Sequence, residues 1–355
     1  MKHHLLILAN PNGRNVTPRK IRELQDVFQW SNGTLQTTVR VTEDLSKLEE
    51  VVTEYENREV TILGIVGGDG TVMHTRTLVE ERWKYHPSYA FFPLGTMNNI
   101  QRAVGLDGKD SSLQLARCIV EAAATDTLGE YAVPIPSLDI NGRKGFNIGF
   151  GLISKLLWMY NGHSAKHYRE LEEALQTSPL FEYQKKYREI TGKREQDFFD
   201  LLSKERGLWG AAKTVLRLLK ARDKSYLLHK ELMGEVIFDG EGQDFPQSPL
   251  GAYISCYEKV NLGLGRFNPV PSPKANKEKG KFQVVIPYGN PFSIVTQLPK
   301  VAAGRRIPNT VYRYISSFDL PGERIAQVDG EIILDKGFKV RYDETRDVIA
   351  LKNLL

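Results

Sequence analysis

The sequence predicts a chain of two domains, an α/β domain at the N-terminus and a mainly β domain after it. Its 355 residues are about twice the length of a common domain, and 41% hydrophobic with 26% charged residues is ordinary for a globular protein. Up to about residue 130, short β-branched apolar runs alternate with longer polar–apolar segments, which is typical of βαβ units on a mostly parallel sheet. Beyond that point, short strands alternate with glycine turns.

The first domain is expected to alternate strands and helices in chain order. Apolar runs predict the strands, and apolar residues at helical spacing predict the helices, with Thr42 or Asp44 as the N-cap of the second helix. The predicted strands are 5–9, 35–41, 60–66 and 89–92, and the predicted helices are 18–28, 44–56, 71–82 and 111–123. Because helices join these strands, we expect the strands to lie parallel.

The second domain is expected to contain hairpins and a helical insertion. A strand at 131–140 runs into Asn141-Gly142, and one at 236–238 runs into Asp239-Gly240, both dipeptides that favour tight hairpin turns. A charged stretch at about 163–229 interrupts the strands and predicts two or three helices. We therefore place the domains at 1–130 and 131–355.

Composition excludes several classes of protein. No apolar run approaches the roughly 18 to 20 residues that span a bilayer, and residues 5–9 are too short for a secretory signal, so a cytoplasmic protein is expected. A net charge of +5 is mild, and without a recognition motif it gives no support for nucleic-acid binding. Cys118 and Cys256 are too few for a disulfide scaffold or a cysteine zinc site, and both are expected to be small buried residues.

A glycine-rich loop, Gly67-Gly68-Asp69-Gly70-Thr71, follows a strongly apolar strand and precedes a helix. Glycines let a bulky anion approach main-chain N–H groups, and a helix N-terminus favours negative charge, so the loop has the features of a phosphate cradle. It matches neither GxxxxGK[ST] nor GxGxxG. The alternative is a plain strand-to-helix turn in which Asp69 caps the following helix.

Two further loops follow neighbouring strands. Pro93-Leu94-Gly95-Thr96-Met97-Asn98-Asn99 comes after the strand at 89–92, and Asn10-Pro11-Asn12-Gly13 ends the first strand. Ligands of open α/β sheets bind at the carboxyl ends of the strands, so all three loops are expected at one edge of the sheet.

These loops, in this order, resemble the diacylglycerol kinase catalytic-domain family, which includes sphingosine kinases and bacterial lipid kinases. Val328-Asp329-Gly330-Glu331 and Phe146-Asn147-Ile148-Gly149-Phe150-Gly151 extend the resemblance into the second domain, as do Gly263-Leu264-Gly265 and Pro273-Lys274-Ala275. The resemblance implies a Rossmann-like nucleotide-binding domain, a C-terminal β-sandwich, ATP in the cleft between them, and Mg²⁺-dependent phosphate transfer to a lipid hydroxyl such as that of diacylglycerol or a sphingoid base.

The resemblance also assigns roles to single residues. Asp69 matches the loop aspartate that acts through Mg²⁺ or its waters, and Glu331 matches a glutamate suggested to be the general base. The positions implied to hold the nucleotide are Asn10, Thr42, Gly67, Gly68, Gly70, Thr71, Gly95, Thr96 and Asn98. These roles suit phosphoryl transfer, which needs main-chain donors, a metal and a carboxylate near the attacking hydroxyl.

Other interpretations stay open. The family usually has carboxylates where this chain has Thr75, Asn99 and Lys279, which is compatible with a nucleotide-binding pseudokinase. An NAD kinase-like enzyme would share the GGDG loop, but its second motif is an Asn-Glu pair that Asn98-Asn99 does not supply. From sequence alone, Asp329-Gly330 reads most simply as a hairpin turn.

The inserted segment suggests contacts outside the site. Residues 206–228 form an expected amphipathic helix with Lys213, Arg217 and Lys220 on one face and Trp209 near an end. Such a helix could dock on anionic lipid at the membrane periphery or pack on the β domain. The charged, aromatic segment 163–204 could be a lid, a substrate collar or an oligomer contact such as a homodimer.

Overall fold

The computed structural model divides the chain into two compact units. It describes residues 3–13, 15–31, 33–95, 100–101, 106, 110–152, 154, 235–247, 249–256, 280–289, 297, 300, 306–322 and 325–351. Unit 1 comprises Met1–Ser137, Gly142–Lys144 and Asp343–Leu355, and unit 2 comprises Leu138–Asn141 and Gly145–Tyr342. The sequence interpretation put all residues after 130 in the second domain, whereas the last thirteen residues, 343–355, lie in unit 1.

Unit 1 contains the predicted alternation of strands and helices. Every predicted element of this part is confirmed, with ends that agree to within two residues. The elements are β1 (His3–Ala9), α1 (Pro18–Gln29), β2 (Leu35–Val41), α2 (Leu45–Tyr55), β3 (Ile62–Gly67), α3 (Asp69–Arg82), β4 (Ser88–Pro93), α5 (Ser111–Thr125) and the 3-10 helix η1 (Leu128–Tyr131). Of the two candidate caps for α2, Asp44 is the one used, because its Oδ1 accepts a hydrogen bond from the Lys47 amide at 2.7 Å.

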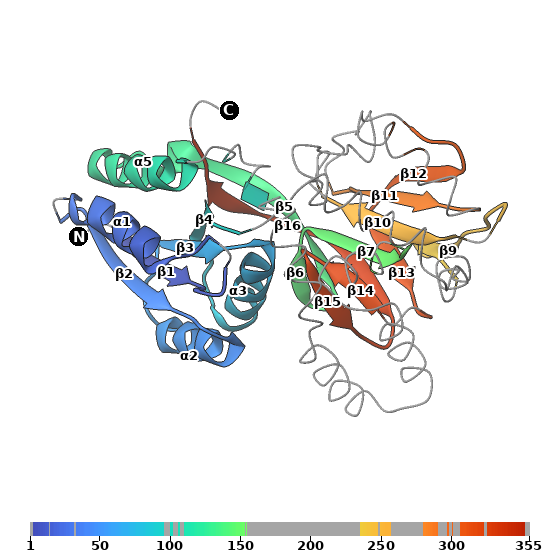
Figure 1. The fold of residues 1–355 in the computed structure, drawn as a ribbon, viewed down its shortest axis with the longest axis horizontal. Helices are drawn as coiled ribbons and strands as arrows, with labels where there is room; N and C mark the ends of the chain where they lie inside the picture. Colours follow the sequence, from blue (N-terminus) through green and yellow to red (C-terminus); the bar gives the residue numbers. More distant parts are fainter. Residues whose placement is uncertain are drawn as a thin grey trace, which may run out of the picture. The chain divides into compact units, whose positions relative to one another are not determined.

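The strands of unit 1 form a parallel sheet in the order β2-β1-β3-β4, and the end of β16 (Phe338–Ile349) joins it beside β4. Val348 of β16 pairs in parallel with Tyr89 of β4, and this pairing returns the C-terminus to unit 1. Helices α1 and α5 contact each other, as do α2 and α3, and Figure 1 shows the two pairs on opposite faces of the sheet. Strand β3 is buried along its whole length, as expected for a strand covered on both faces.

Unit 2 is built from short, mostly antiparallel strands. They are β5 (Ala132–Ile140) and β6 (Arg143–Gly145), which both begin in unit 1, and β7 (Asn147–Gly151), β8 (Ile237–Phe238), β9 (Glu241–Gly242), β10 (Gly251–Ser255), β11 (Phe282–Pro287), β12 (Thr310–Ile315), β13 (Ser317–Leu320), β14 (Ile325–Val328) and β15 (Glu331–Leu334). Six of them form a sheet in the order β12-β11-β10-β7-β14-β15.

A second group of strands in unit 2 packs against this sheet. Strand β13 pairs with β16 and β8, and β8 pairs with β9. The ring centroid of Phe150 on β7 lies 5.7 Å from that of Phe318 on β13 and 5.2 Å from that of Phe338 on β16. These aromatic contacts form part of a core between the two groups of strands.

Three two-residue turns close hairpins in the way the sequence predicts. Asn141, Asp239 and Asp329 have φ of 51°, 49° and 46°, and each is followed by a glycine with positive φ. Two successive left-handed residues give the tight turn whose twist matches that of paired strands. The predicted turns are therefore confirmed.

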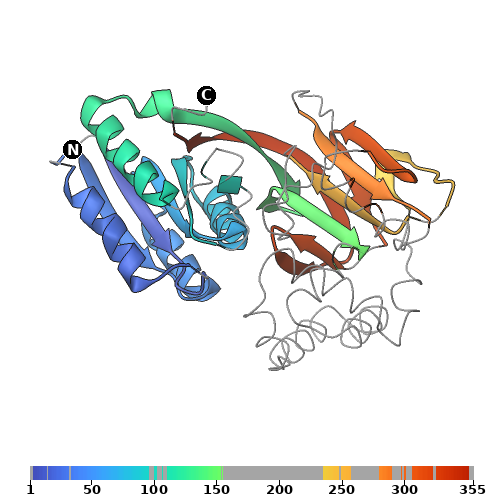
Figure 2. The same ribbon diagram turned by 45° about the horizontal axis from the view of Figure 1, so that its top comes forward.

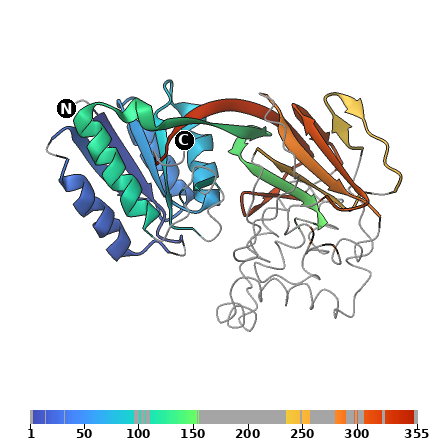
Figure 3. The same ribbon diagram turned by 90° about the horizontal axis from the view of Figure 1, so that it is seen from above.

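Strands β5 and β16 pair with each other, and the chain passes from one unit to the other within both. Figures 2 and 3 show the two strands side by side. No helix in the described part of the chain is long and apolar enough to cross a membrane. Cys118 and Cys256 form no disulfide and are half-buried, so the expectation that both are buried is wrong.

The predicted helical insertion at about 163–229 lies outside the described residues. The amphipathic helix expected at 206–228 and the segment 163–204 fall within it. The same holds for the glycine and proline motifs around residues 263–275 and for Lys279.

Candidate nucleotide and phosphate site

Three loops meet at the carboxyl ends of β1, β3 and β4. The amide Nδ2 of Asn10, after β1, donates to Oγ1 of Thr71 in the glycine loop at 3.1 Å. Asn15, farther along the same loop, donates through its backbone N–H to the carbonyl of Leu94 and through Nδ2 to the carbonyl of Gly95, both at 3.1 Å. The β1 loop is therefore hydrogen-bonded to both of the other loops, which agrees with the predicted common edge.

This edge coincides with the reversal in strand order. Strand β1 lies between β2 and β3, so the sheet grows first to one side of β1 and then to the other. Open α/β sheets bind their ligands at such a switch point, in the crevice outside the strand carboxyl ends. The loops after β1 and β3 flank this reversal.

The glycines of these loops allow close approach of main chain. A Cβ atom at Gly67 would lie 2.7 Å from Oγ1 of Thr71, which no real side chain tolerates. A Cβ atom at Gly68 would lie 3.4 Å from Cα of Gly95, so the two glycine turns are immediate neighbours. At Gly68 and Gly95 the two turns thus approach each other through backbone, and glycine at such a turn suits the approach of an anion to main-chain N–H groups.

Asp69 is the first residue of α3, and Gly68 is the N-cap, with no side-chain cap for this helix. The alternative role of Asp69 as a helix cap is therefore wrong. Its side chain is buried, and Oδ1 lies 3.4 Å from the backbone N of Ile100. The carboxylate and the partial positive charge of the α3 N-terminus stand together at the loop edge, an arrangement suited to a phosphate accompanied by a cation.

Thr42 follows β2 at the same edge of the sheet. It is buried, its backbone N donates to the carbonyl of Ala9 at 2.9 Å, and its Oγ1 lies 3.4 Å from that carbonyl. Thr96 and Asn98 lie outside the described residues. Their predicted contacts with a nucleotide, like those of the other loop residues, stay predictions.

The Asp329-Gly330 turn in unit 2 is anchored by a buried polar cluster. The Asp329 carboxylate accepts hydrogen bonds from the backbone N of Phe146 at 2.9 Å, the backbone N of Asn147 at 3.0 Å and Nδ2 of Asn147 at 3.2 Å. Oδ1 of Asn147 in turn accepts from the hydroxyls of Tyr253 at 3.0 Å and Ser255 at 2.7 Å. Asp329 therefore fixes the turn on β7.

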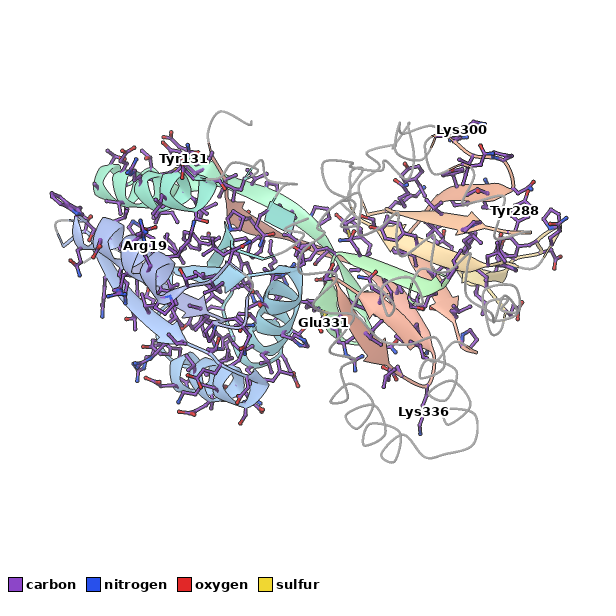
Figure 4. The ribbon with its side chains drawn as sticks, in the orientation of Figure 1. Arg19, Tyr131, Tyr288, Lys300, Glu331 and Lys336 are labelled. Carbon is purple, nitrogen blue, oxygen red and sulfur yellow. The ribbon has the colours of Figure 1, made fainter. Side chains whose placement is uncertain are left out.

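Glu331 is the residue that this turn presents. It begins β15, pairs with Val328 across the turn and keeps much of its surface exposed (Figure 4). The protein atoms around its carboxyl nevertheless raise its pKa by desolvation. A carboxyl with a raised pKa is a stronger base once it is deprotonated, which suits proton removal from a hydroxyl. Asp69 belongs to unit 1 and Glu331 to unit 2.

The residues present fit a magnesium ion held largely by its substrate. Within the described ranges, no three His, Cys, Asp or Glu side chains gather to hold a metal ion. The Asp69 carboxylate is a hard oxygen donor, and Mg²⁺ is commonly bound by one or two carboxylates with phosphate oxygens and water as the other ligands. Thr75, where the resemblance predicts a carboxylate, is fully buried on α3.

Sequence reasoning missed two polar clusters. The first is the Asn147 cluster, in which Tyr253, Ser255 and Asp329 lie 106, 108 and 182 positions from Asn147 in the chain. The second contains Arg76 and Glu80 on α3, which are 1% and 2% exposed and bonded to each other. Their i, i+4 spacing was visible in the sequence, but their burial was not.

Comparisons with known proteins agree with this fold and these motifs. Residues 4–128 match the family model of the diacylglycerol kinase catalytic domain. No curated protein matches the chain.

Solved structures from Bacillus anthracis str. Sterne share the architecture. One provisionally described as a diacylglycerol kinase superposes with a TM-score of 0.63 at 12% identity, covering 100% of this chain and 98% of its own. A second with the same provisional description gives 0.60 at 14% identity, covering 100% and 99%. A third, described as a diacylglycerol kinase, gives 0.59 at 13% identity, covering 100% and 98%. At these identities the likeness shows the fold.

The family match covers β1 to α5 and the glycine loop, together with the loops after β1 and β4. Residues 4–128 therefore match the diacylglycerol kinase catalytic domain, and the resemblance drawn from the motifs of this part is confirmed.

Proposed function

We propose that this protein is a lipid kinase that transfers the γ-phosphate of ATP to the hydroxyl group of a lipid. The observation that carries the proposal is the meeting of three loops, around Asn10, Asp69 and Gly95, at the switch point of the unit 1 sheet. The family match over residues 4–128 supports a kinase of the diacylglycerol type. The acceptor lipid is defined by class alone, as a hydroxyl on a diacylglycerol-like or sphingoid-like molecule.

Each part of the site has a task in this reaction. The N–H groups of the glycine loop and the α3 N-terminus bind phosphate oxygens, and Asn10 holds the Thr71 hydroxyl in place. Asp69 would hold the Mg²⁺ ion, which when bound neutralises charge on the phosphate oxygens. These interactions position the γ-phosphorus for attack.

The transfer itself breaks one bond and forms another. The acceptor oxygen attacks the γ-phosphorus, the bond to the β–γ bridging oxygen breaks, and ADP leaves with that oxygen. The proton of the hydroxyl passes to the Glu331 carboxylate, whose raised pKa makes it a stronger base than an ordinary glutamate. The phosphorylated lipid carries the transferred group.

The test uses γ-labelled ATP with Mg²⁺ and a mixed lipid extract separated by chromatography. Wild type should label a lipid, Asp69→Ala and Glu331→Ala should abolish the labelling, and Glu81→Gln and Glu241→Gln serve as exposed carboxylate controls in the two units. Labelling that survives both alanine substitutions contradicts the assigned roles. Absence of any labelled lipid while ATP still binds contradicts the kinase proposal.

A second candidate, a nucleotide-binding protein without transferase activity, is favoured by one observation. Thr75, where the resemblance predicts a carboxylate, offers a buried hydroxyl instead. This candidate predicts ATP binding with no labelled product in the same assay. A non-lipid acceptor, as in an NAD kinase-like enzyme, would give a labelled water-soluble product instead.

A further inference from the structure

A buried ion pair on α3, two helical turns from Asp69, is the centre of a polar network. Arg76 and Glu80 are almost completely buried, and Arg76 donates to Oε1 of Glu80 through Nε at 2.8 Å and through Nη2 at 2.5 Å. The guanidinium also stands over the Tyr89 ring of β4, 5.4 Å from its centroid. We call Arg76, Glu80, Ser137, Lys144 and Asp343 the α3 ion network.

Ser137 links the helix to the C-terminal strand. Its Oγ accepts a hydrogen bond from Nη2 of Arg76 at 3.2 Å and donates to Oδ2 of Asp343 at 2.9 Å. One fully buried hydroxyl thus joins α3, β5 and β16. Removing this hydroxyl would break both bonds and leave the backbone unchanged.

Lys144 supplies a second link. Its Nζ lies 3.2 Å from Oδ1 of Asp343, and its backbone N donates to Oγ1 of Thr77 on α3 at 2.9 Å. Burial alone would raise the pKa of Asp343, but the charge of Lys144 and the hydrogen bond from Ser137 lower it overall. Nη2 of Arg76 on α3 also lies 4.0 Å from Oδ2 of Asp343. Asp343 is therefore ionised and held by Ser137, Lys144 and Arg76.

Three members of the network lie where the chain passes from one unit to the other. Ser137 and Lys144 are each the last residue of a unit 1 segment, and Asp343 is the first residue of another. The remaining crossing, between Asn141 and Gly142, falls in the tight turn that joins β5 to β6. Helix α3 thus contacts the unit 1 residue at three of the four crossings. Arg76 contacts Ser137 and Asp343, and Thr77 contacts Lys144.

Buried ions are a costly way to gain stability, because the loss of hydration offsets most of their attraction. Their directional bonds do fix the relative positions of the elements that carry them. Here those elements are the helix behind the proposed phosphate site and the segments that connect the two units.

We propose that Arg76 and Ser137 are positioning residues, which join α3 to the crossing segments so that the Asp69 end of the helix and these segments move as one body. The inference rests on the proposed function in one respect, the use of Asp69, at the start of this helix, in the transfer step. Nucleotide affinity depends on the loops of unit 1, so it is insensitive to the loss of the α3 ion network. The rate of phosphate transfer, in contrast, depends on this network.

The first test needs no ligand and no activity. Hydrogen exchange of the full-length protein is compared for wild type, Ser137→Ala and Arg76→Lys, with Arg82→Ala as the control. Arg82 lies on the same helix but bonds to Glu49 and Thr53 of α2. Ser137→Ala and Arg76→Lys should speed exchange by about tenfold or more in α3 and in residues 343–349 together, whereas Arg82→Ala should leave 343–349 unchanged. Faster exchange around residue 137 with α3 unaffected would overturn the proposal.

The second test separates positioning from stability. With Ser137→Ala, kcat for phosphate transfer should fall by about tenfold while KM for ATP stays within about threefold, and Arg82→Ala should change neither. A KM that rises as much as kcat falls, or a kcat like that of wild type, overturns the positioning role. If the wild type transfers no phosphate, the proposed function fails, and the exchange experiment alone decides whether the joint exists.

Discussion

Asp69 in unit 1 and Asp329 in unit 2 are both 5% exposed and both lie beside a glycine, yet their surroundings differ. The Asp329 carboxylate accepts three hydrogen bonds of 2.9 to 3.2 Å from Phe146 and Asn147. Asp69 stands at the N-terminus of α3, where its Oδ1 is 3.4 Å from the Ile100 amide and the neighbouring turns are glycine. Two equally buried carboxylates thus stand in different surroundings, so burial alone does not assign a role to either.

Asp329 and Glu331, at the two ends of one turn, also differ. Asp329 holds the left-handed turn on β7, and Glu331, two residues later, is exposed and has a raised pKa. Under the proposed function, Asp329 has a structural role and Glu331 a chemical one. In unit 1 the corresponding pair is the α3 ion network, with a structural role, and Asp69, with a chemical one.

The largest effect is expected from Asp69→Asn, which keeps the shape of the side chain and removes its charge. Under the proposed mechanism kcat should fall by about a thousandfold, roughly 4 kcal/mol of transition-state stabilisation. The melting temperature should stay near that of wild type, because the helix cap is Gly68. Glu81→Gln, on the exposed face of α3, is the control in the same phosphate-transfer assay. Near-normal transfer by Asp69→Asn would remove the contrast between the two aspartates.

Asp329→Asn should act on stability. The asparagine side chain has one accepting oxygen in place of two, so its NH₂ group would face a buried N–H donor of Phe146 or Asn147. We expect a loss of about 3 kcal/mol in the free energy of unfolding, measured in urea. If the variant were as stable as wild type but inactive, Asp329 would have a chemical role and the comparison would be wrong.

Glu331→Gln should lower kcat by about a hundredfold, the usual contribution of a general base. Because a base acts when deprotonated, the wild-type kcat should rise with pH through the pKa of Glu331, which desolvation by the protein atoms around the carboxyl raises above its ordinary 4.5. That limb of the profile should vanish in the variant. A profile with the same limb in both proteins would assign the titration to another group. Glu241→Gln, an exposed carboxylate of unit 2, controls for lost charge.

The smallest effects are expected from two neighbouring glycines. Gly67→Ala places a Cβ atom 2.7 Å from Thr71 Oγ1 and should cost about 1 to 3 kcal/mol of stability. Gly68→Ala meets Gly95 Cα at an ordinary 3.4 Å, so stability should change by less than about 1 kcal/mol. If Gly68 faces the phosphate, ATP affinity measured by calorimetry should nevertheless fall several-fold. Unchanged affinity would show that the phosphate does not bind at this turn.

Local patterns accounted for most of the fold. The strands of unit 1 were predictable because apolar and β-branched runs of four to seven residues are typical of a buried sheet, and Asp44 was a candidate cap from its chemistry. The three hairpin turns were predictable because Asn-Gly and Asp-Gly adopt left-handed backbone at low cost. The order of the glycine loops pointed to the edge where they meet.

Long-range pairings were not predictable in the same way. The return of β16 to unit 1 depends on Val348 pairing with Tyr89, and the Ser137–Asp343 bond joins residues 206 positions apart. No local spacing encodes either pairing. The burial of Thr75 was not predictable either, because a position in a motif does not show which face of the helix packs against the rest of the unit.

The central claim, that the glycine loop of unit 1 binds the phosphates of a nucleotide, is tested most directly by hydrogen exchange with and without ATP and Mg²⁺. The account predicts slower exchange in peptides covering residues 67–71 and 10–15, and loss of this protection in Asp69→Asn. Protection confined to other parts of the chain, with 67–71 unchanged at saturating ATP, would contradict it.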